Sequence, residues 1–327
     1  MPENKPERIA AIVVTYNRKR LLGECLDSLL RQSHSLDALY IIDNASTDGT
    51  YECLLDRGLV SPADQSRETV RLVALAASPD RRVEVHYIRM PDNAGGAGGF
   101  AEGMERAAGA GFDWLWLMDD DVLAAPDALD VLVRKKEHLE AARDGSFILN
   151  SLVLARDQQD GDALAFPLRE VSASGSPRMG AFHWRLSEVQ DKVHDGLYRW
   201  ICPFNGTFVP ARAVAEVGPP RREFFIYGDE TDFQFRAARV FRLYTAVDSR
   251  VYHPKQRPGA FDWKQYYNIR NMFIVNRHFS HPALRNFKLV LMGLAMGLRH
   301  GRAGMKLMLR AIADGLAGRL GRRDDLA

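Results

Sequence analysis

Cysteine is scarce in this chain, and its few copies are scattered. The 327 residues include only Cys25, Cys53 and Cys202. An odd number of widely spaced cysteines gives neither a disulfide framework nor the paired spacing of a zinc site. No secretory hydrophobic segment precedes the first apolar run, which starts at Ile9. The longest apolar stretch, residues 289–298, has about half the length of a membrane span. We therefore expect a cytoplasmic protein.

Net charge is also small. The chain carries 44 Lys and Arg against 42 Asp and Glu, which gives +2 at pH 7. This balance gives no reason to expect a nucleic-acid partner. The basic residues are concentrated near the C-terminal end, where nine Lys or Arg and three Asp follow residue 279. A hydrophobic content of 46% and a charged content of 26% are typical of a globular enzyme.

The first half of the chain alternates apolar runs with segments of helical spacing. Predicted buried strands occupy residues 9–15, 38–42, 83–90 and 114–118. Helical spacing is found at residues 21–30 and 97–111. The alternation predicts an α/β fold with a mostly parallel, Rossmann-like sheet that helices cover on both faces.

The remaining segments have other patterns. We interpret residues 57–82 as a surface insertion around a short helix at 69–77. Residues 156–196 are polar and broken by Gly and Pro, which favours hairpins and a mobile loop. Beyond residue 266 the chain turns helical, with a break at Pro282. Residues 283–320 predict two amphipathic helices that are apolar on one side and rich in Arg and Lys on the other.

Polar side chains gather where the predicted strands end. They are residues 15–18 after the first strand, Asp43 and Asn44 after the second, residues 93–96 after the third and residues 119–121 after the last. In parallel sheets, ligands bind outside the carboxyl ends of the strands. The four strand ends therefore predict one shared crevice.

Asp119, Asp120 and Asp121 are the clearest chemical signal in that crevice. If the chain stays extended, the side chains of Asp119 and Asp121 point to one side and that of Asp120 to the other. Two carboxylates on one side suit a hard divalent cation such as Mg²⁺ or Mn²⁺, which also binds phosphate oxygens. The alternative is a solvated acidic turn.

Several motifs together resemble one enzyme family. They are VVTYNR at 13–18, IDNASTDG at 42–49, NAGGAGGF at 93–100, WLMDDD at 116–121, FIYGDETD at 225–232 with His253 beyond it, and YYNIRN at 266–271. The chain resembles the family 2 glycosyltransferases of the GT-A fold, and most closely the bacterial galactofuranosyltransferases. The resemblance runs from about residue 9 to residue 271.

The resemblance implies a domain plan. Residues 1–265 would form the GT-A catalytic domain, with a nucleotide-sugar half at 1–122 and an acceptor half at 123–265. Residues 266–327 would form a C-terminal amphipathic helical region.

The resemblance also implies a donor site for a UDP- or dTDP-sugar. Its residues would be Thr15, Tyr16, Asn17, Arg18, Asp43, Asn44, Asn93, Gly95, Gly96, Asp119 and Asp120. Asp43 could accept the N3–H of uracil or thymine, or it could cap the turn at 44–49. Arg18 could reach a phosphate or start a solvated helix. Asp120 would face the ribose or a nearby basic residue.

The glycines at 95–98 have a rival interpretation. After a strand, with an acidic residue about twenty positions on, they imitate a dinucleotide-binding fingerprint. That fingerprint uses one acid rather than three in a row. We favour glycines that let the backbone approach the sugar or the diphosphate.

Family relatives suggest the metal ligands and the acceptor side. Asp119, Asp121 and His253 match the ligands of Mn²⁺ or Mg²⁺ in the family. Asn205 and Gly206 match a loop that lines the acceptor side. The aromatic run that ends at Tyr227 suits a wall against which a sugar ring packs.

The acidic pair Asp229 and Glu230 supplies candidates for the catalytic base. In relatives the base is the second acid of the pair, which falls on Glu230, and Asp229 is the second candidate. If a helix starts near Gly228, Asp232 would pair with Arg236 instead. The alternative for the pair is a helix N-terminal charge favoured by the helix dipole.

The resulting hypothesis is an inverting, metal-dependent glycosyltransferase. It would move galactofuranose from UDP-galactofuranose to a polysaccharide or a lipid-linked glycan. The alternatives are a rhamnosyltransferase that uses dTDP-rhamnose and, more distantly, a nucleotidyltransferase or a noncatalytic scaffold. The basic, amphipathic helices at 283–320 would either dock on the inner face of the cytoplasmic membrane or pack on the catalytic domain.

Overall fold

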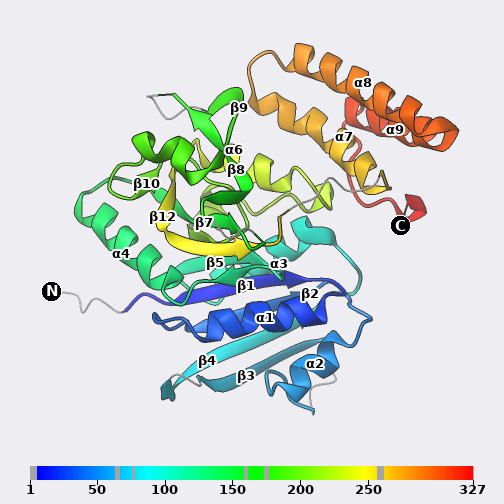
Figure 1. The fold of residues 1–327 in the computed structure, drawn as a ribbon. Coiled ribbons are helices and arrows are strands. Elements are labelled where there is room, and N and C mark those ends of the chain that lie inside the picture. Colours follow the sequence, from blue (N-terminus) through cyan, green and yellow to red (C-terminus); the bar gives the residue numbers. More distant parts are fainter. Residues whose placement is uncertain are drawn as a thin grey trace.

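A large mixed sheet forms the centre of the molecule. The computed structural model describes residues 6–62, 67–75, 78–157, 161–172, 177–255 and 261–326 (Figure 1). The neighbouring strands of the sheet follow the order β10-β12-β7-β11-β5-β1-β2-β4-β3. Beside this path, β6 pairs with β12, and β8 pairs with β7 and β9.

The elements have the following bounds. The strands are β1 (Ile9–Thr15), β2 (Ala38–Asp43), β3 (Glu68–Leu75), β4 (Ser78–Arg89), β5 (Trp114–Asp119), β6 (Leu123–Ala124), β7 (Phe147–Ala155), β8 (Ala163–Val171), β9 (Pro177–Arg185), β10 (Leu197–Tyr198), β11 (Thr207–Pro210) and β12 (Arg242–His253). The α-helices are α1 (Lys19–Leu30), α2 (Thr50–Asp56), α3 (Gly95–Gly109), α4 (Ala128–Ala141), α5 (Ala213–Glu216), α6 (Asp229–Ala237), α7 (Lys264–Val275), α8 (Pro282–Arg299) and α9 (Gly301–Leu316). Short 3₁₀ turns are η1 (Leu186–Lys192), η2 (Arg222–Phe224), η3 (Asn276–His278) and η4 (Asp324–Leu326).

The register of the parallel strands brings the polar strand ends together. Strand β1 pairs in parallel with β2 and β5, and β2 pairs in parallel with β4. Thr15 lies opposite Asp43, and Val14 lies opposite Asp119. Strands β7 and β12 are also parallel, whereas β11 runs antiparallel between β5 and β7. The expected α/β fold is confirmed. Parallel pairing holds for the neighbouring strands β5, β1, β2 and β4 and for β7 with β12, while the sheet as a whole is mixed.

Strand β1 is apolar throughout because both of its faces are covered. Alternate residues point to opposite faces of a strand. Ile9, Ala11 and Val13 belong to the core on the α1 side, which includes Leu22 and Leu26. Ala10, Ile12 and Val14 belong to the core that α3 covers with Phe100 and Met104. The unbroken apolar run from Ile9 to Val14 therefore fits a central strand.

Helix α3 lies unusually close to β1 because glycines face the strand. A Cβ atom added to Gly99 would lie 2.4 Å from Cγ1 of Val14. One added to Gly103 would lie 2.4 Å from Cγ2 of Ile12. This close packing fixes the N-terminal end of α3 beside the carboxyl ends of the strands.

The expected helix at 69–77 is wrong where the structure describes it. Glu68–Leu75 forms β3, an edge strand that pairs antiparallel with β4, and residues 76–77 lie outside the described residues. Thr69, Val70 and Val73 are β-branched and favour a strand once a partner is present. The hairpin expected within 156–196 is confirmed by β8 and β9, while residues 158–160 and 173–176 lie outside the described part.

The C-terminal helices pack on one another beside the sheet domain (Figure 1). The break expected at Pro282 is confirmed, since Pro282 begins α8. Gly293 of α8 lies against Ile312 of α9, and Gly315 of α9 lies against Phe273 of α7. No helix in the described part of the chain is long and apolar enough to cross a membrane.

We predict that Gly103→Ala destabilises the fold by roughly 1–3 kcal/mol, because the added methyl group overpacks the contact between α3 and Ile12. Urea unfolding followed by circular dichroism measures the change. Gly109→Ala in the same helix is the control, because its Cβ would meet no heavy atom within 4 Å. Equal stabilities of the two variants would contradict the close packing described here.

Candidate active site

A pocket of about 310 Å³ collects most of the chemically distinctive side chains. The expected residues that line it are Arg18, Gly96, Asp119, Asp121, Asn205, Tyr227, Asp229, Glu230 and His253. They come from segments far apart in the sequence, and the sheet and the helices beside it bring them together. The metal, base and acceptor candidates therefore share one cavity with part of the donor set.

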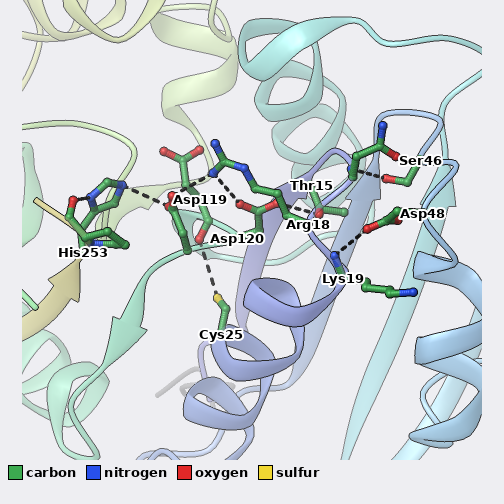
Figure 2. Close-up of polar contacts among 12 residues, drawn as sticks. Thr15, Arg18, Lys19, Cys25, Ser46, Asp48, Asp119, Asp120 and His253 are labelled. Carbon is green, nitrogen blue, oxygen red and sulfur yellow. Dashed lines mark hydrogen bonds and ion pairs between the residues drawn. The ribbon is translucent and has the colours of Figure 1, made fainter. Parts of the chain in front are cut away.

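Asp120 points away from the pocket and into a hydrogen-bond network (Figure 2). Its carboxylate accepts a hydrogen bond of 2.7 Å from Oγ1 of Thr15, and it lies 3.2 Å from Nη1 of Arg18. The same Arg18 nitrogen lies 2.8 Å from Oδ2 of Asp121. Burial raises the pKa of Asp120 to about 6, against the lowering effect of Thr15 and Arg18. The basic neighbour expected for Asp120 is Arg18.

Asp119 and Asp121 have opposite electrostatic environments. Burial raises the pKa of Asp119 to about 8, and the neighbouring charges of Asp121 and Asp120 add to the shift. Burial also favours a higher pKa for Asp121, but His253 and Arg18 outweigh burial and lower the pKa of this carboxyl. Asp119 is therefore the carboxylate that lacks compensation.

His253 reaches this cluster from the end of β12 (Figure 2). Its Nε2 lies 3.1 Å from Oδ1 of Asp121. Its Nδ1 lies 2.6 Å from the carbonyl oxygen of Pro254 and donates a hydrogen bond to it. That bond orients the ring, and it resembles the outer-shell contact that fixes histidine ligands in metal sites. Contact with Asp121 outweighs burial and raises the pKa of His253.

The oxygen atoms of the pocket fit a hard cation. Oδ1 of Asp121 is buried, and the side-chain atom that it faces is Nε2 of His253, 3.1 Å away. Two neighbouring carboxylates, of which Asp119 lacks compensation, together with one imidazole match the donor types that Mn²⁺ or Mg²⁺ accepts. Across the described ranges, however, no three His, Cys, Asp or Glu side chains already stand in the arrangement of a metal site.

The acidic pair begins α6, as the sequence predicts. Gly228 is the N-cap, with φ at 85°, and Asp229 and Glu230 follow in the first turn. Burial, then the charge of Glu230, raises the pKa of Asp229 well above its usual range. Oε2 of Glu230 is buried without a hydrogen-bond partner. Asp229 is therefore suited to hold a proton.

Asp232 has a different environment, because three basic side chains surround it. Its carboxylate lies 2.8 Å from Nε of Arg236, 2.8 Å from Nε2 of His278 and 3.3 Å from Nε of Arg221. The pairing with Arg236 is confirmed. Asp232 does not line the pocket.

Eight expected donor residues lie at or just beyond the ends of β1, β2, β4 and β5, or at the start of α3. They are Thr15, Tyr16, Asn17, Asp43, Asn44, Asn93, Gly95 and Asp120, and none of them lines the pocket itself. Asp43 is buried and accepts hydrogen bonds from the Tyr87 hydroxyl at 2.6 Å and the Ser46 amide at 2.8 Å. The turn-capping interpretation of Asp43 is therefore present in the structure.

The other loop residues join the strand ends to one another. Asn17 accepts a hydrogen bond from the Thr47 amide at 2.7 Å, which links the loops after β1 and β2. Asn44 donates to the carbonyl of Gly95 at 3.1 Å, which links the end of β2 to α3. Tyr16 is exposed.

The acceptor-side loop approaches the pocket before β11. Oδ1 of Asn205 is buried without a hydrogen-bond partner, and Asn205 lines the pocket. Gly206 has φ at 82°, and a Cβ there would lie 2.8 Å from Cβ of Ser151. Gly206 therefore allows the tight turn that places Asn205, but it does not line the pocket.

Lys264 and Phe166 line the pocket although the sequence analysis did not select them. Lys264 begins α7, and Phe166 packs against His253 with ring centroids 4.7 Å apart. No local pattern marks either residue, because each reaches the pocket through the tertiary fold. The nearest signal was the YYNIRN motif, which starts two positions after Lys264. Cys202 also lines the pocket, and burial raises the pKa of its thiol to about 12.

Comparison with known proteins gives sequence relatives over most of the chain. Residues 6–143 match the family model described as "Glycosyltransferase like family 2". The galactofuranosyltransferase GlfT1 of Mycobacterium tuberculosis (strain CDC 1551 / Oshkosh) is 33% identical over 252 residues, which cover 76% of this chain and 70% of the relative. GlfT1 of Mycolicibacterium smegmatis is 29% identical over 255 residues, which cover 76% and 71%.

Solved structures support the fold. S. aureus TarS has a TM-score of 0.55 at 12% identity, over 95% of this chain and 49% of TarS. TarS 1–349 in complex with UDP has a TM-score of 0.52 at 11% identity, over 95% and 83%. GalNAc-T7 with UDP, GalNAc and Mn²⁺ has a TM-score of 0.54 at 14% identity, over 77% and 44%.

We predict that Asp119→Asn removes stabilisation by Mn²⁺ without destabilising the cation-free protein, because it deletes one of three adjacent like charges. In the unmodified chain, Mn²⁺ at about 100 times its Kd should add about 2.7 kcal/mol of stability. Thermal unfolding at pH 8, in EDTA and in Mn²⁺, measures both effects.

The control for this experiment is Asp56→Asn, which changes an exposed carboxylate at the end of α2. It should keep the full response to Mn²⁺. A response to Mn²⁺ that survives in Asp119→Asn would exclude Asp119 as a ligand.

Proposed function

Because the chain belongs to glycosyltransferase family 2, we propose that it transfers galactofuranose from UDP-galactofuranose to a polysaccharide or lipid-linked glycan, with inversion of configuration. It is a glycosyltransferase with the GT-A fold. The donor sugar is proposed from the 33% identity to GlfT1. The observation that carries the chemistry is one pocket that holds the carboxylates of Asp119 and Asp121 together with the acidic pair of α6.

Asp119, Asp121 and His253 would hold Mn²⁺ or Mg²⁺. The buried Oδ1 of Asp121, which faces Nε2 of His253, supports this assignment. When bound, such a cation neutralises the negative charge that develops on a departing diphosphate.

Two basic side chains from distant parts of the sequence would bind the diphosphate. Arg18 and Lys264 both line the pocket, and the Arg18 side chain is about half exposed (48%). A guanidinium and an ammonium group stabilise phosphate oxygens by charge-assisted hydrogen bonds. Gly96 lines the same pocket, and no heavy atom lies within 4 Å of where its Cβ would be, which leaves room for the donor.

The nucleoside would lie over the loops after β1 and β2. Tyr16 is exposed and offers an aromatic face to a pyrimidine. Asn17 and Asp43 shape these loops through their bonds to Thr47 and Ser46. In this proposal Asp43 either orients the loop that contacts the nucleobase or accepts a hydrogen bond from the nucleobase through the remaining lone pairs of its carboxylate.

Glu230 would act as the general base. Its buried Oε2 lacks a hydrogen-bond partner. Glu230 lines a pocket that Asn205 and Tyr227 also line. The acceptor hydroxyl oxygen would bond to the anomeric carbon while the bond from that carbon to the diphosphate oxygen breaks, and the hydroxyl proton would pass to Glu230. Asp229 would keep its own proton, since its pKa is raised. A single displacement needs no enzyme nucleophile.

We predict UDP release from UDP-galactofuranose that depends on both Mn²⁺ and an acceptor glycan, and a fall in kcat of about 10²–10⁴-fold in Glu230→Gln, since the base is removed. A coupled UDP assay measures the rates. The control is Asp229→Asn, which mimics a protonated carboxyl and should keep more activity than Glu230→Gln. Turnover of dTDP-rhamnose in place of UDP-galactofuranose would overturn the donor assignment.

The outer face of α8 and α9 supports a second part of the proposal, a peripheral contact with an anionic membrane surface. Leu284, Phe287 and Leu291 are exposed and share one face of α8. Lys288, Arg299, Arg302 and Lys306 are exposed on the same two helices. An apolar face with basic neighbours suits a bilayer that contains acidic lipids.

Packing on the catalytic domain is present as well, because the inner faces of the two helices join a core cluster with α7 and Phe225. Removing the helices would therefore expose that core. Surface substitutions give a cleaner test of the membrane contact than a truncation.

We predict that Leu284→Ser, Phe287→Ser and Leu291→Ser together lower flotation with phosphatidylglycerol-containing vesicles by at least about tenfold, because each side chain contributes about 1.5–3 kcal/mol when fully buried in lipid. Liposome flotation measures binding. The matched control is Val70→Ser with Leu72→Ser, two exposed apolar residues of β3. If both variants float at the level of the unmodified chain, the proposed membrane contact is wrong.

A further inference from the structure

The turn that precedes the acidic pair has an unusual backbone. Phe225 has φ at 67° and ψ at −68°, and Tyr227 has φ at 63°. The amide of Ile226 bonds to the carbonyl of Phe224 at 2.9 Å, which closes a very tight turn. Non-glycine residues in such conformations are strained and persist only where the surroundings hold them. We call residues 224–228 the acidic-pair turn.

Asn271 of α7 holds the acidic-pair turn through its side chain. Its Nδ2 lies 2.7 Å from the carbonyl oxygen of Tyr227, 2.9 Å from that of Ile226 and 3.0 Å from that of Phe224. Asn271 is fully buried. One amide group therefore collects three carbonyls that a regular helix or strand would not leave on the same side.

Arg270, the neighbour of Asn271, fixes the orientation of that amide. Its Nε donates to Oδ1 of Asn271 at 2.8 Å, so Nδ2 must face the turn. Its Nη2 lies 3.2 Å from the carbonyl oxygen of Phe224 and 3.3 Å from that of Glu223. Arg270 is fully buried as well. The two side chains together bind the backbone from residue 223 to residue 227.

The opposite side of the acidic-pair turn rests on the start of α3. The amide of Ala97 donates to the carbonyl oxygen of Phe225 at 3.2 Å. A Cβ atom on Gly95 would lie 2.0 Å from that same oxygen, so Gly95 leaves space that no other residue would. The turn is thus held between α7 and the helix end that carries Gly96 into the pocket.

The acidic-pair turn delivers pocket residues directly. Ile226 and Tyr227 belong to it, and Asp229 and Glu230 follow it at once. Because the chain between the turn and Glu230 is short, a small rotation of the backbone would move its carboxylate. Misplacement of a reacting group by about 1 Å can cost about 10²-fold in rate.

We propose that Arg270 and Asn271 are positioning residues that hold the acidic-pair turn and so aim Glu230 at the acceptor. The inference rests on the proposed role of Glu230 as the base. It also gives the YYNIRN motif a physical task, since its last two residues make these hydrogen bonds. Neither side chain lines the pocket, so each acts through the turn.

The test compares two buried asparagines near α7. Asn271→Leu keeps the approximate shape but removes the donors to the turn. Asn276→Leu is the matched control, because Asn276 is buried and donates to Oδ1 of Asn286 at 2.9 Å, away from the pocket. Thermal unfolding of both variants shows how much stability each substitution removes.

We predict that Asn271→Leu lowers kcat by about 10–100-fold, while the donor KM and the affinity for UDP change by less than about twofold. Asn276→Leu should keep kcat within about twofold even when its loss of stability is as large. Steady-state kinetics and calorimetry with UDP measure these quantities. Equal losses of kcat in the two variants, or full activity in Asn271→Leu, would overturn the inference.

Hydrogen exchange separates this inference from the proposed reaction. Amides in the peptide 223–232 should exchange faster in Asn271→Leu than in the unmodified chain. In Asn276→Leu they should exchange at the same rate as in the unmodified chain. This readout needs no substrate, so it decides whether Asn271 holds the turn even if the donor screen or Glu230→Gln refutes the reaction. If Asn271→Leu does not fold, Arg270→Lys replaces it, because lysine keeps the charge but cannot bond the amide and two carbonyls together. Unchanged exchange in Asn271→Leu, or in Arg270→Lys where that variant replaces it, would refute the inference.

Discussion

Repulsion between carboxylates is the constraint on which the active site depends. Asp119, Asp121, Asp229 and Glu230 line one pocket, and burial raises the pKa of Asp119 and Asp229. Water would screen such charges at the surface, but a partly buried site screens them weakly. The protein compensates only some of them, through Arg18 and through the contact of Asp121 with His253. In the proposed reaction, the charge that remains uncompensated would attract a cation and accept the proton of an attacking hydroxyl.

The sequence predicts those parts of the molecule that depend on continuous patterns. The parallel strands could be predicted because β1 and β5 are apolar over their whole buried length. The aspartates follow one strand directly, so their place at the sheet edge followed from the strand itself. His253 was found through the resemblance, and the structure brings it to Asp121. The edge strand β3 was missed because its partner β4, rather than its own spacing, decides its conformation.

Other features depend on contacts that no local pattern records. Lys264 reaches the pocket because α7 packs beside the acidic-pair turn. The hydrogen bonds of Arg270 and Asn271 join segments more than forty residues apart. Asp43 shows a related limit of prediction from motifs. Its turn-capping hydrogen bonds alone account for a buried Asp at this position, with or without a nucleobase contact. The motifs therefore located the site, while the interactions that hold it in shape required the three-dimensional arrangement.

The reversed direction of β11 has a consequence for how such an enzyme can diversify. In a wholly parallel sheet, the loop that leads into a strand lies at the edge remote from the ligand. Because β11 runs against β5 and β7, its leading loop lies at the ligand edge and carries Asn205 into the pocket. In the proposed function this loop lies on the acceptor side, so changes in its length or sequence would reshape the surface offered to a glycan without disturbing the strand register. Acceptor preference would then evolve separately from the residues proposed to bind the donor.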